Sequence, residues 1–161
     1  MPRKPVFYSF HYANDALRVQ MVRNIGALEG NAPVSPNAWE EVKRKGPTAI
    51  QKWIDDSMNY RRCVIVLVGE QTAGRHWVEY EIKKAWNDKR GLFGIYIHNL
   101  ACMLTGKCRQ GANPFERFKV PDGRLLSQFV PCYDPGQDAY KGISSNIEQW
   151  VDAAIVAANG R

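Results

Sequence analysis

The sequence contains neither an apolar run long enough to cross a bilayer nor a paired-cysteine motif. No two of its four cysteines are spaced as C-x-x-C, which argues against zinc-ribbon and thioredoxin chemistry; they are Cys63, Cys102, Cys108 and Cys132. The first residues lead into a short stretch with Ser9 and His11, not into a signal-peptide core. These absences predict a cytoplasmic protein with reduced thiols and no membrane partner.

The common nucleotide and metal motifs are also missing. The segment from Gly69 to Gly74 has P-loop spacing, but Arg75 and His76 follow it where a lysine and a hydroxyl residue are needed. This argues against a nucleoside triphosphatase. No G-x-G-x-x-G follows the first apolar run, which disfavours an ordinary dinucleotide-binding Rossmann domain. Because H-E-x-x-H and G-x-S-x-G are absent and the three histidines are widely spaced, no metal site is predicted.

The bulk composition fits one globular domain over residues 1–161. Hydrophobic residues make up 45% of the chain, which favours a packed core, and the formal net charge is +6. That charge favours an anionic partner and leaves a phosphate-bearing metabolite, an acidic protein and nucleic acid open. Nucleic acid is the least favoured of these partners, since the basic residues are scattered over several predicted elements.

Short apolar runs alternate with amphipathic stretches, a pattern typical of an α/β fold with a mainly parallel sheet. A first strand is predicted over Pro5–Phe10. The run Cys63–Val68 is continuously apolar and is therefore placed at the centre of the sheet. Further strands are expected at Leu92–Ile97 and at Phe129–Val130. Residues 26–38 are expected to form a loop, with a weak strand around Val34.

Four helices are predicted between and after these strands. Pro47 suits the first turn of the second helix. The third is expected from Trp77 to about Lys89, with Gly91 ending it. Capping-box spacing at Ser145 and Glu148 predicts the start of the fourth. The residues expected to face the core, helix by helix, are Leu17, Met21 and Ile25; Ile50, Trp53, Ile54 and Met58; Val78, Ile82 and Ala85; and Ile147, Trp150, Val151, Ala154 and Ile155.

Two segments are candidates for a functional site. Ser9 and His11 follow the first strand, and the Trp77 helix follows the central strand. In open parallel sheets, ligands bind beyond the carboxyl ends of the strands, so both segments are expected at one edge. The helical period places Glu81 roughly 60° from Val78, on the border of the inward face. Glu79 falls on the opposite border, so the two acids are not expected to share a site.

The same segments carry a resemblance to a known family. Val6 to Tyr12 reads V-F-x-S-F-H-Y, Trp77 to Ile82 reads W-V-x-Y-E-I, Trp39-Glu40 precedes the second helix, and Asn113 to Phe115 reads N-P-F. Together they resemble the TIR-like proteins of bacterial Thoeris anti-phage systems, the ThsB type. The resemblance implies a flavodoxin-like, three-layer TIR-type α/β fold with helices on both sides of a mainly parallel sheet.

The resemblance also implies a function. In NAD-cleaving TIR domains the last residue of W-x-x-x-E is the catalytic glutamate, here Glu81. The expected enzyme cleaves the nicotinamide–ribose bond of NAD+ as substrate, with no cofactor, and makes a cyclic ADP-ribose isomer as a second messenger for a separate effector. Self-association on activation is a further expectation. The alternative is a non-catalytic TIR adaptor that works by TIR–TIR contact; a receiver-like domain is disfavoured because no cluster of strand-end acids is evident.

One carboxylate is sufficient for this reaction, because the nicotinamide ring of NAD+ is already cationic and departs neutral. Three of these candidates also have a purely structural interpretation. Glu81 would interact favourably with the positive end of the helix dipole, Trp77 would be a packing residue, and Ser9 would make an ordinary strand-end hydrogen bond. The residues expected to contact the substrate are Ser9, Phe10, His11, Tyr12, Trp39, Arg75 and Trp77.

Overall fold

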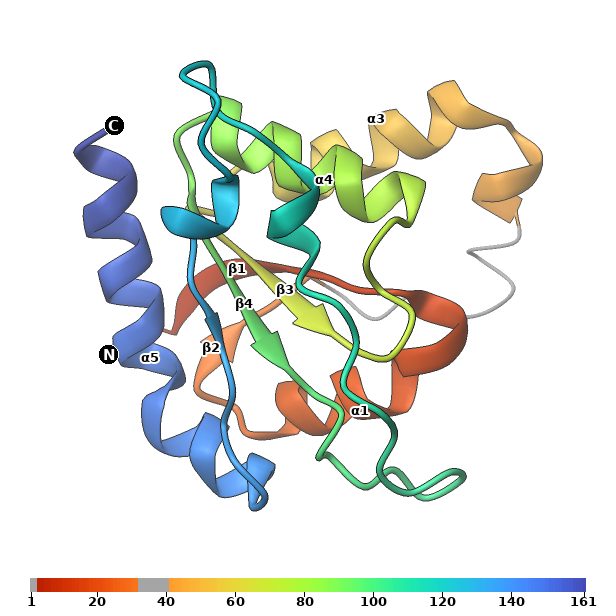
Figure 1. Cartoon of the computed structure of the whole chain (residues 1–161). Helices are drawn as coiled ribbons and strands as arrows, with labels where there is room; N and C mark the ends of the chain where they lie inside the picture. The colour runs from red at the N-terminus through yellow and green to blue at the C-terminus, as the bar shows by residue number, and fades with distance from the viewer. Residues whose placement is uncertain (1–2, 32–40) are drawn as a thin grey trace.

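A computed structural model describes residues 3–31 and 41–161 (Figure 1). A five-stranded parallel sheet has the order β2-β1-β3-β4-β5. No helix in these two ranges is long and apolar enough to span a bilayer. The strands are β1 (Lys4–Ser9), β2 (Leu28–Glu29), β3 (Cys63–Val68), β4 (Gly91–Tyr96) and β5 (Cys132–Tyr133). The helices that lie wholly within the described residues are α1 (Tyr12–Asn24), α3 (Pro47–Met58), α4 (His76–Asn87) and α5 (Ala139–Asn159), with short 3-10 turns η1 (Pro114–Arg117) and η2 (Leu126–Gln128).

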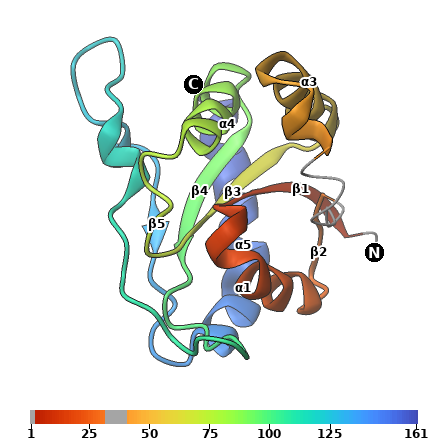
Figure 2. The same ribbon diagram turned by 90° about the vertical axis from the view of Figure 1, so that its right-hand side faces the viewer.

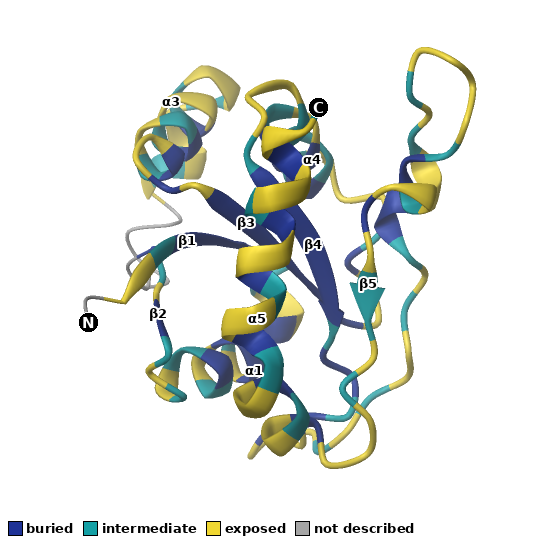
Figure 3. Ribbon diagram, turned by 90° about the vertical axis from the view of Figure 1, so that its left-hand side faces the viewer, coloured by how far each residue is buried: buried dark blue, intermediate teal, exposed yellow. Residues whose placement is uncertain are grey.

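The sheet separates two hydrophobic cores, and this makes the fold three-layered. Helices α1 and α5 pack on one face, while α3 and α4 pack on the other (Figure 2). Every residue of β3 is buried, because this strand has neighbours on both sides and helices on both faces (Figure 3). The expected flavodoxin-like α/β fold and the central position of Cys63–Val68 are therefore confirmed.

One predicted loop contains a strand, and the last predicted strand is misplaced. A second strand does exist, but it is β2, at Leu28–Glu29, inside the segment interpreted as a loop; the weak strand around Val34 falls outside the described residues. The last strand is β5, at Cys132–Tyr133, and not Phe129–Val130. Val130 is buried against the α3/α4 core before the chain reaches the sheet. Strands this short depend on pairing with β1 and β4, which an isolated sequence pattern does not reveal.

Two helix boundaries also differ from expectation. Helix α4 ends at Asn87, Lys89 takes a positive φ of 57°, and Gly91 begins β4 instead of ending the helix. Helix α5 begins at Ala139, where the side chain of Asp138 accepts a hydrogen bond from the Lys141 amide. Ser145 and Glu148 therefore lie inside α5, and the capping-box prediction is wrong.

The buried face of α1 was predicted incorrectly. Leu17 is 44% exposed, while Asp15 and Arg18 are buried with Val19 and Val22. Asp15 and Arg18 can occupy the inner face because they form an ion pair. Apolar spacing alone therefore does not identify the buried face of this helix. Met21 and Ile25 only partly pack against the core, so these three do not form the buried stripe; the apolar faces of α3 and α4 and the Ile147–Val151–Ala154 face of α5 are confirmed.

The Asp15–Arg18 pair fastens three segments at the carboxyl edge of the sheet. Arg18 Nη1 lies 3.2 Å from Asp15 Oδ1, and Arg18 Nε donates to the Leu100 carbonyl at 3.1 Å. Asp15 in turn packs so closely on Gly69, the residue after β3, that a methyl group there would lie 2.2 Å from Asp15 Oδ2. The loops after β3 and β4 are thus held to the start of α1, where the candidate site lies.

Replacing Gly69 with alanine should destabilise the fold by about 1 to 3 kcal/mol, since the added methyl group must displace the buried Asp15 carboxylate from its partners. The matched control is Gly160→Ala, where the nearest atom to the new methyl lies 3.6 Å away and φ is −89°. Urea unfolding of both variants measures the difference. Equal stability of the two would contradict the proposed packing.

Candidate active site

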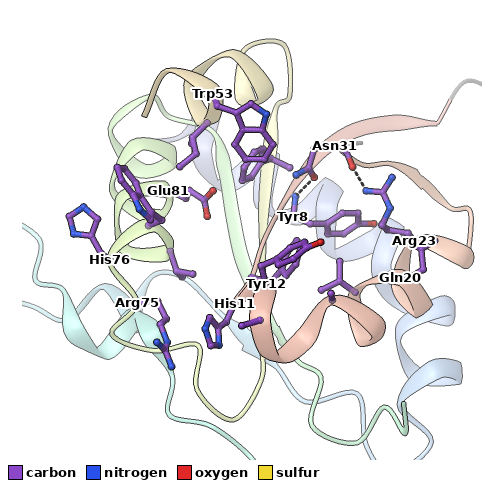
Figure 4. Close-up of a pocket in the computed structure, with 18 of the residues that line it drawn as sticks. Tyr8, His11, Tyr12, Gln20, Arg23, Asn31, Trp53, Arg75, His76 and Glu81 are labelled. Carbon is purple, nitrogen blue, oxygen red and sulfur yellow. Dashed lines mark hydrogen bonds between the residues drawn. The ribbon is translucent and has the colours of Figure 1, made fainter. Parts of the chain in front are cut away.

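A cavity of about 480 Å³ lies beside β1, bounded by α1, α3 and the start of α4 (Figure 4). This volume falls within the usual range for small-molecule sites. Aromatic and aliphatic side chains form most of its wall, and a few polar and charged groups converge on it. The described residues that line it are Phe7, Tyr8, Phe10, His11, Tyr12, Ala13, Ala16, Leu17, Val19, Gln20, Arg23, Asn31, Lys43, Trp53, Ile54, Arg75, His76, Trp77, Val78 and Glu81.

The short β2 leaves much of one side of β1 open among the described residues. Within residues 3–31 and 41–161, β2 pairs only with Lys4 and Pro5, and the rest of β1 has no strand neighbour on that side. At Tyr8 a side chain provides the hydrogen-bond acceptor that a strand would otherwise supply: the Tyr8 amide donates to Asn31 Oδ1 at 2.8 Å. The neighbouring face of α1 carries Ala13 and Ala16, whose small side chains leave room between this helix and α4.

Glu81 provides the buried carboxyl group of the cavity. Its side chain is only 7% exposed, and Figure 4 shows it pointing from α4 into the cavity. Ser9, the last residue of β1, donates its hydroxyl to Glu81 Oε1 at 2.6 Å. Burial raises the pKa of Glu81 to about 8, against the smaller lowering effect of the Ser9 hydrogen bond. At neutral pH this carboxyl is therefore mainly protonated.

Helix α4 contributes a second element of the site, its positive end. Arg75 is the N-cap residue, and its side chain does not cap the helix but donates to the carbonyl and side-chain oxygens of Gln71. First-turn amides without a side-chain cap favour a negatively charged ligand. Arg23 and Lys43 also line the cavity, so cationic residues outnumber Glu81 among its described lining. The electrostatics favour an anionic ligand.

Glu79 lies on the other side of α4. Its Oε2 accepts a hydrogen bond from Arg117 Nε of η1 at 2.7 Å, and it is absent from the described cavity lining. The two acids of the W-V-E-Y-E segment are thus separated, with Glu81 in the cavity and Glu79 in an ion pair that ties α4 to η1. This pairing gives a matched residue for testing Glu81.

The structure brings most of the predicted site residues together. Glu81 shares the cavity with five of them, namely Phe10, His11, Tyr12, Arg75 and Trp77. Ser9 is 1% exposed and hydrogen-bonds Glu81 instead of lining the cavity, so it positions the carboxyl group. Trp77 also packs, edge-on to Tyr80 with ring centroids 5.6 Å apart. Trp39 lies outside the described residues.

Sequence reasoning missed the side of the cavity formed by α1 and α3. Tyr8, Gln20, Arg23, Asn31, Lys43 and Trp53 all contribute to the described wall. A usable signal was present in α1, where Ala13, Ala16 and Gln20 follow helical spacing and continue to Arg23. A stripe that combines small, polar and basic residues indicates a face that neither packs in a core nor simply meets solvent.

The Glu81→Gln variant should be more stable than the wild-type protein at high pH. Between pH 4.5 and about 8 the folded protein keeps a proton on Glu81 that the unfolded chain releases, so wild-type stability falls as pH rises through this window. Glutamine accepts the Ser9 hydrogen bond but cannot ionise. Urea unfolding at pH 5 and pH 9 should show a gain of about 1 to 3 kcal/mol at pH 9 alone; the same gap at both pH values would contradict the burial argument.

Two comparisons with known proteins place the chain in a family. The family model described as "Thoeris protein ThsB, TIR-like domain" matches residues 7–101, which include the end of β1 and all of β3 and α4, with Glu81. A Bacillus cereus (strain MSX-D12) protein named "Putative cyclic ADP-D-ribose synthase ThsB1" is 32% identical over 118 residues. That match covers 70% of this chain and 62% of the relative, so the chain spans less than two thirds of the relative's length. On its sequence and its three-layer architecture, the chain belongs to the TIR-like domain family of Thoeris ThsB proteins.

Proposed function

We propose that the protein binds NAD+, cleaves its nicotinamide–ribose bond, and converts the ADP-ribosyl group into a cyclic ADP-ribose isomer that carries an anti-phage signal to a separate effector. The observation that carries this proposal is the buried Glu81 carboxyl, held by Ser9 and directed into a cavity. The name of the Bacillus cereus relative, a cyclic ADP-D-ribose synthase, supports the choice of substrate and product.

The bond-breaking step needs one negative charge at the ribose. The bond from C1′ to the ring nitrogen breaks, its electron pair neutralises the nicotinamide cation, and positive charge develops on the ribosyl group. An ionised Glu81 next to C1′ stabilises that charge, and the low-dielectric cavity makes the interaction stronger than in water. No general acid is required, because nicotinamide leaves as a neutral molecule.

The raised pKa of Glu81 gives the site a preference for the oxidised dinucleotide. A cationic nicotinamide ring beside the carboxyl favours its ionised form, so substrate binding releases the proton that burial keeps on Glu81. The neutral ring of NADH provides no such charge. Binding and activation of Glu81 are therefore coupled, and the carboxylate is formed only when the cation that it is to stabilise is present.

The remainder of the dinucleotide is matched by the rest of the cavity. The pyrophosphate carries negative charge that suits Arg75 and the positive end of α4. Phe10, Tyr12 and Trp53 provide aromatic surface for the rings. A non-catalytic adaptor that works through TIR–TIR contact remains the competing function, and it requires none of these cavity features.

Glu81→Gln should lower the rate of nicotinamide release by about 10³-fold or more, because a neutral amide cannot stabilise the ribosyl cation. The matched control is Glu79→Gln, which removes an acid from the same helix outside the described cavity lining and should retain turnover. The assay incubates wild-type and variant proteins, each from phage-infected and uninfected cells, with NAD+ and identifies products by mass spectrometry.

Two results would contradict the proposal. One is nicotinamide release by Glu81→Gln at the wild-type rate. The other is no NAD+ loss by the wild-type protein from either source combined with self-association that survives the Glu81 substitution; this result would favour the adaptor function.

The value of kcat/KM should rise with pH through a midpoint near 8, since free Glu81 must lose its proton to act. The kcat midpoint should lie lower, because the bound nicotinamide cation favours the carboxylate. Ser9→Ala should move the kcat/KM midpoint upward by removing the hydrogen bond that lowers the pKa of Glu81. A pH–rate series on both proteins measures this, and an unchanged midpoint in Ser9→Ala would contradict the positioning role of Ser9.

A further inference from the structure

We propose that His11 is the general base of the second chemical step, taking the proton from the hydroxyl group that captures the ribosyl cation. This inference rests on the proposed NAD+ cleavage and goes beyond it. Breaking the nicotinamide–ribose bond requires no proton transfer, but capture by water or by a sugar hydroxyl does. Glu81 accounts for the first step, and the acceptor of this proton is the part of the reaction that it leaves unassigned.

The position of His11 suits this role. It lies two residues beyond Ser9, immediately before α1, and its imidazole lines the same cavity as Glu81 (Figure 4). The two groups approach the cavity from different elements, His11 from the end of β1 and Glu81 from α4. A ribosyl group held by Glu81 therefore presents another side to the start of α1, where an incoming hydroxyl needs a proton acceptor.

The imidazole is available as a base. Its Nδ1 atom is buried and has no hydrogen-bond partner among the described residues. Burial lowers the pKa of His11, and the nearby Arg75 guanidinium lowers it further, so both effects favour the neutral ring. A buried polar atom without a partner is unusual in a folded protein.

The step balances without any further reactant. An oxygen lone pair of the nucleophile forms the bond to C1′ as the positive charge on the ribosyl group disappears. The O–H proton passes to the imidazole of His11, which becomes cationic and later returns the proton to solvent. With water as nucleophile the product is ADP-ribose; with a hydroxyl of the same ADP-ribosyl group the product is cyclic.

Glu81 is less suited to accept this proton. Its carboxylate stabilises the cation until the new bond is complete, and a proton on Glu81 would remove that charge too early. Its Oε1 also accepts the Ser9 hydrogen bond. Two groups with separate tasks resolve this conflict: Glu81 retains its negative charge until the new bond is complete, and His11 takes the proton.

A nucleophile that has no proton to lose tests the assignment. The ring nitrogen of 3-acetylpyridine can capture the same ribosyl cation and form an exchanged dinucleotide without any base. The experiment incubates the full-length protein, from phage-infected cells, with NAD+ and 3-acetylpyridine. Mass spectrometry then gives the ratio of hydroxyl-capture products, linear plus cyclic, to the exchanged dinucleotide.

His11→Asn should lower this ratio by about 10²-fold while leaving exchange active, because asparagine cannot accept the proton. Asparagine is also a favoured N-cap residue, so it suits the start of α1 where His11 precedes Tyr12. The matched control is His98→Asn, which replaces a histidine that is absent from the described cavity lining. Its ratio should equal that of the wild-type protein.

Other outcomes overturn the assignment. An unchanged ratio in His11→Asn means that another group accepts the proton, and an equal loss of capture and exchange means that His11 acts in binding or folding. Failure of the underlying NAD+ cleavage looks different, because the wild-type protein would then produce neither exchanged dinucleotide nor hydroxyl-capture products.

Discussion

The hydrogen bond from Ser9 to Glu81 is the contact on which the site depends. It joins the last residue of β1 to the second turn of α4, across 72 positions of sequence, at 2.6 Å between two buried side chains. A carboxyl group buried without a partner would be costly, and one fully paired with a cation would have no charge left for a ligand. A single neutral donor satisfies part of the group and leaves the rest directed into the cavity.

The sheet and the core packing of α4 hold both ends of this hydrogen bond in place. Ser9 is paired in register with Val66 of the fully buried β3, and Val78 and Ile82 fix the same turn of α4 against the α3/α4 core. Neither end of the hydrogen bond lies in a loop. The site thus consists of a rigid acid on well-packed elements, with more exposed groups such as Arg75 around its rim.

The sequence predicted those parts of the molecule in which local pattern and final environment agree. The apolar run Cys63–Val68 and the inward face of α4 are examples, and they placed Glu81 near a cavity before any coordinates. It failed where the environment is set by distant partners. Asp15 and Arg18 look like surface residues and are buried because they pair. Strands β2 and β5 have two residues each and exist only through their neighbours, so their positions have no local signature.

The shape of the cavity and the environment of Glu81 are set by different elements of the fold. Ala13 and Ala16 contribute surface to the cavity, whereas the environment of Glu81 is built by Ser9 and by its own helix. Larger residues on α1 would narrow the space without disturbing the buried carboxyl. Relatives with this architecture can therefore diverge in the size and shape of the molecule that they admit while the reacting group stays unchanged, and selectivity can evolve on one helix as chemistry is retained on another.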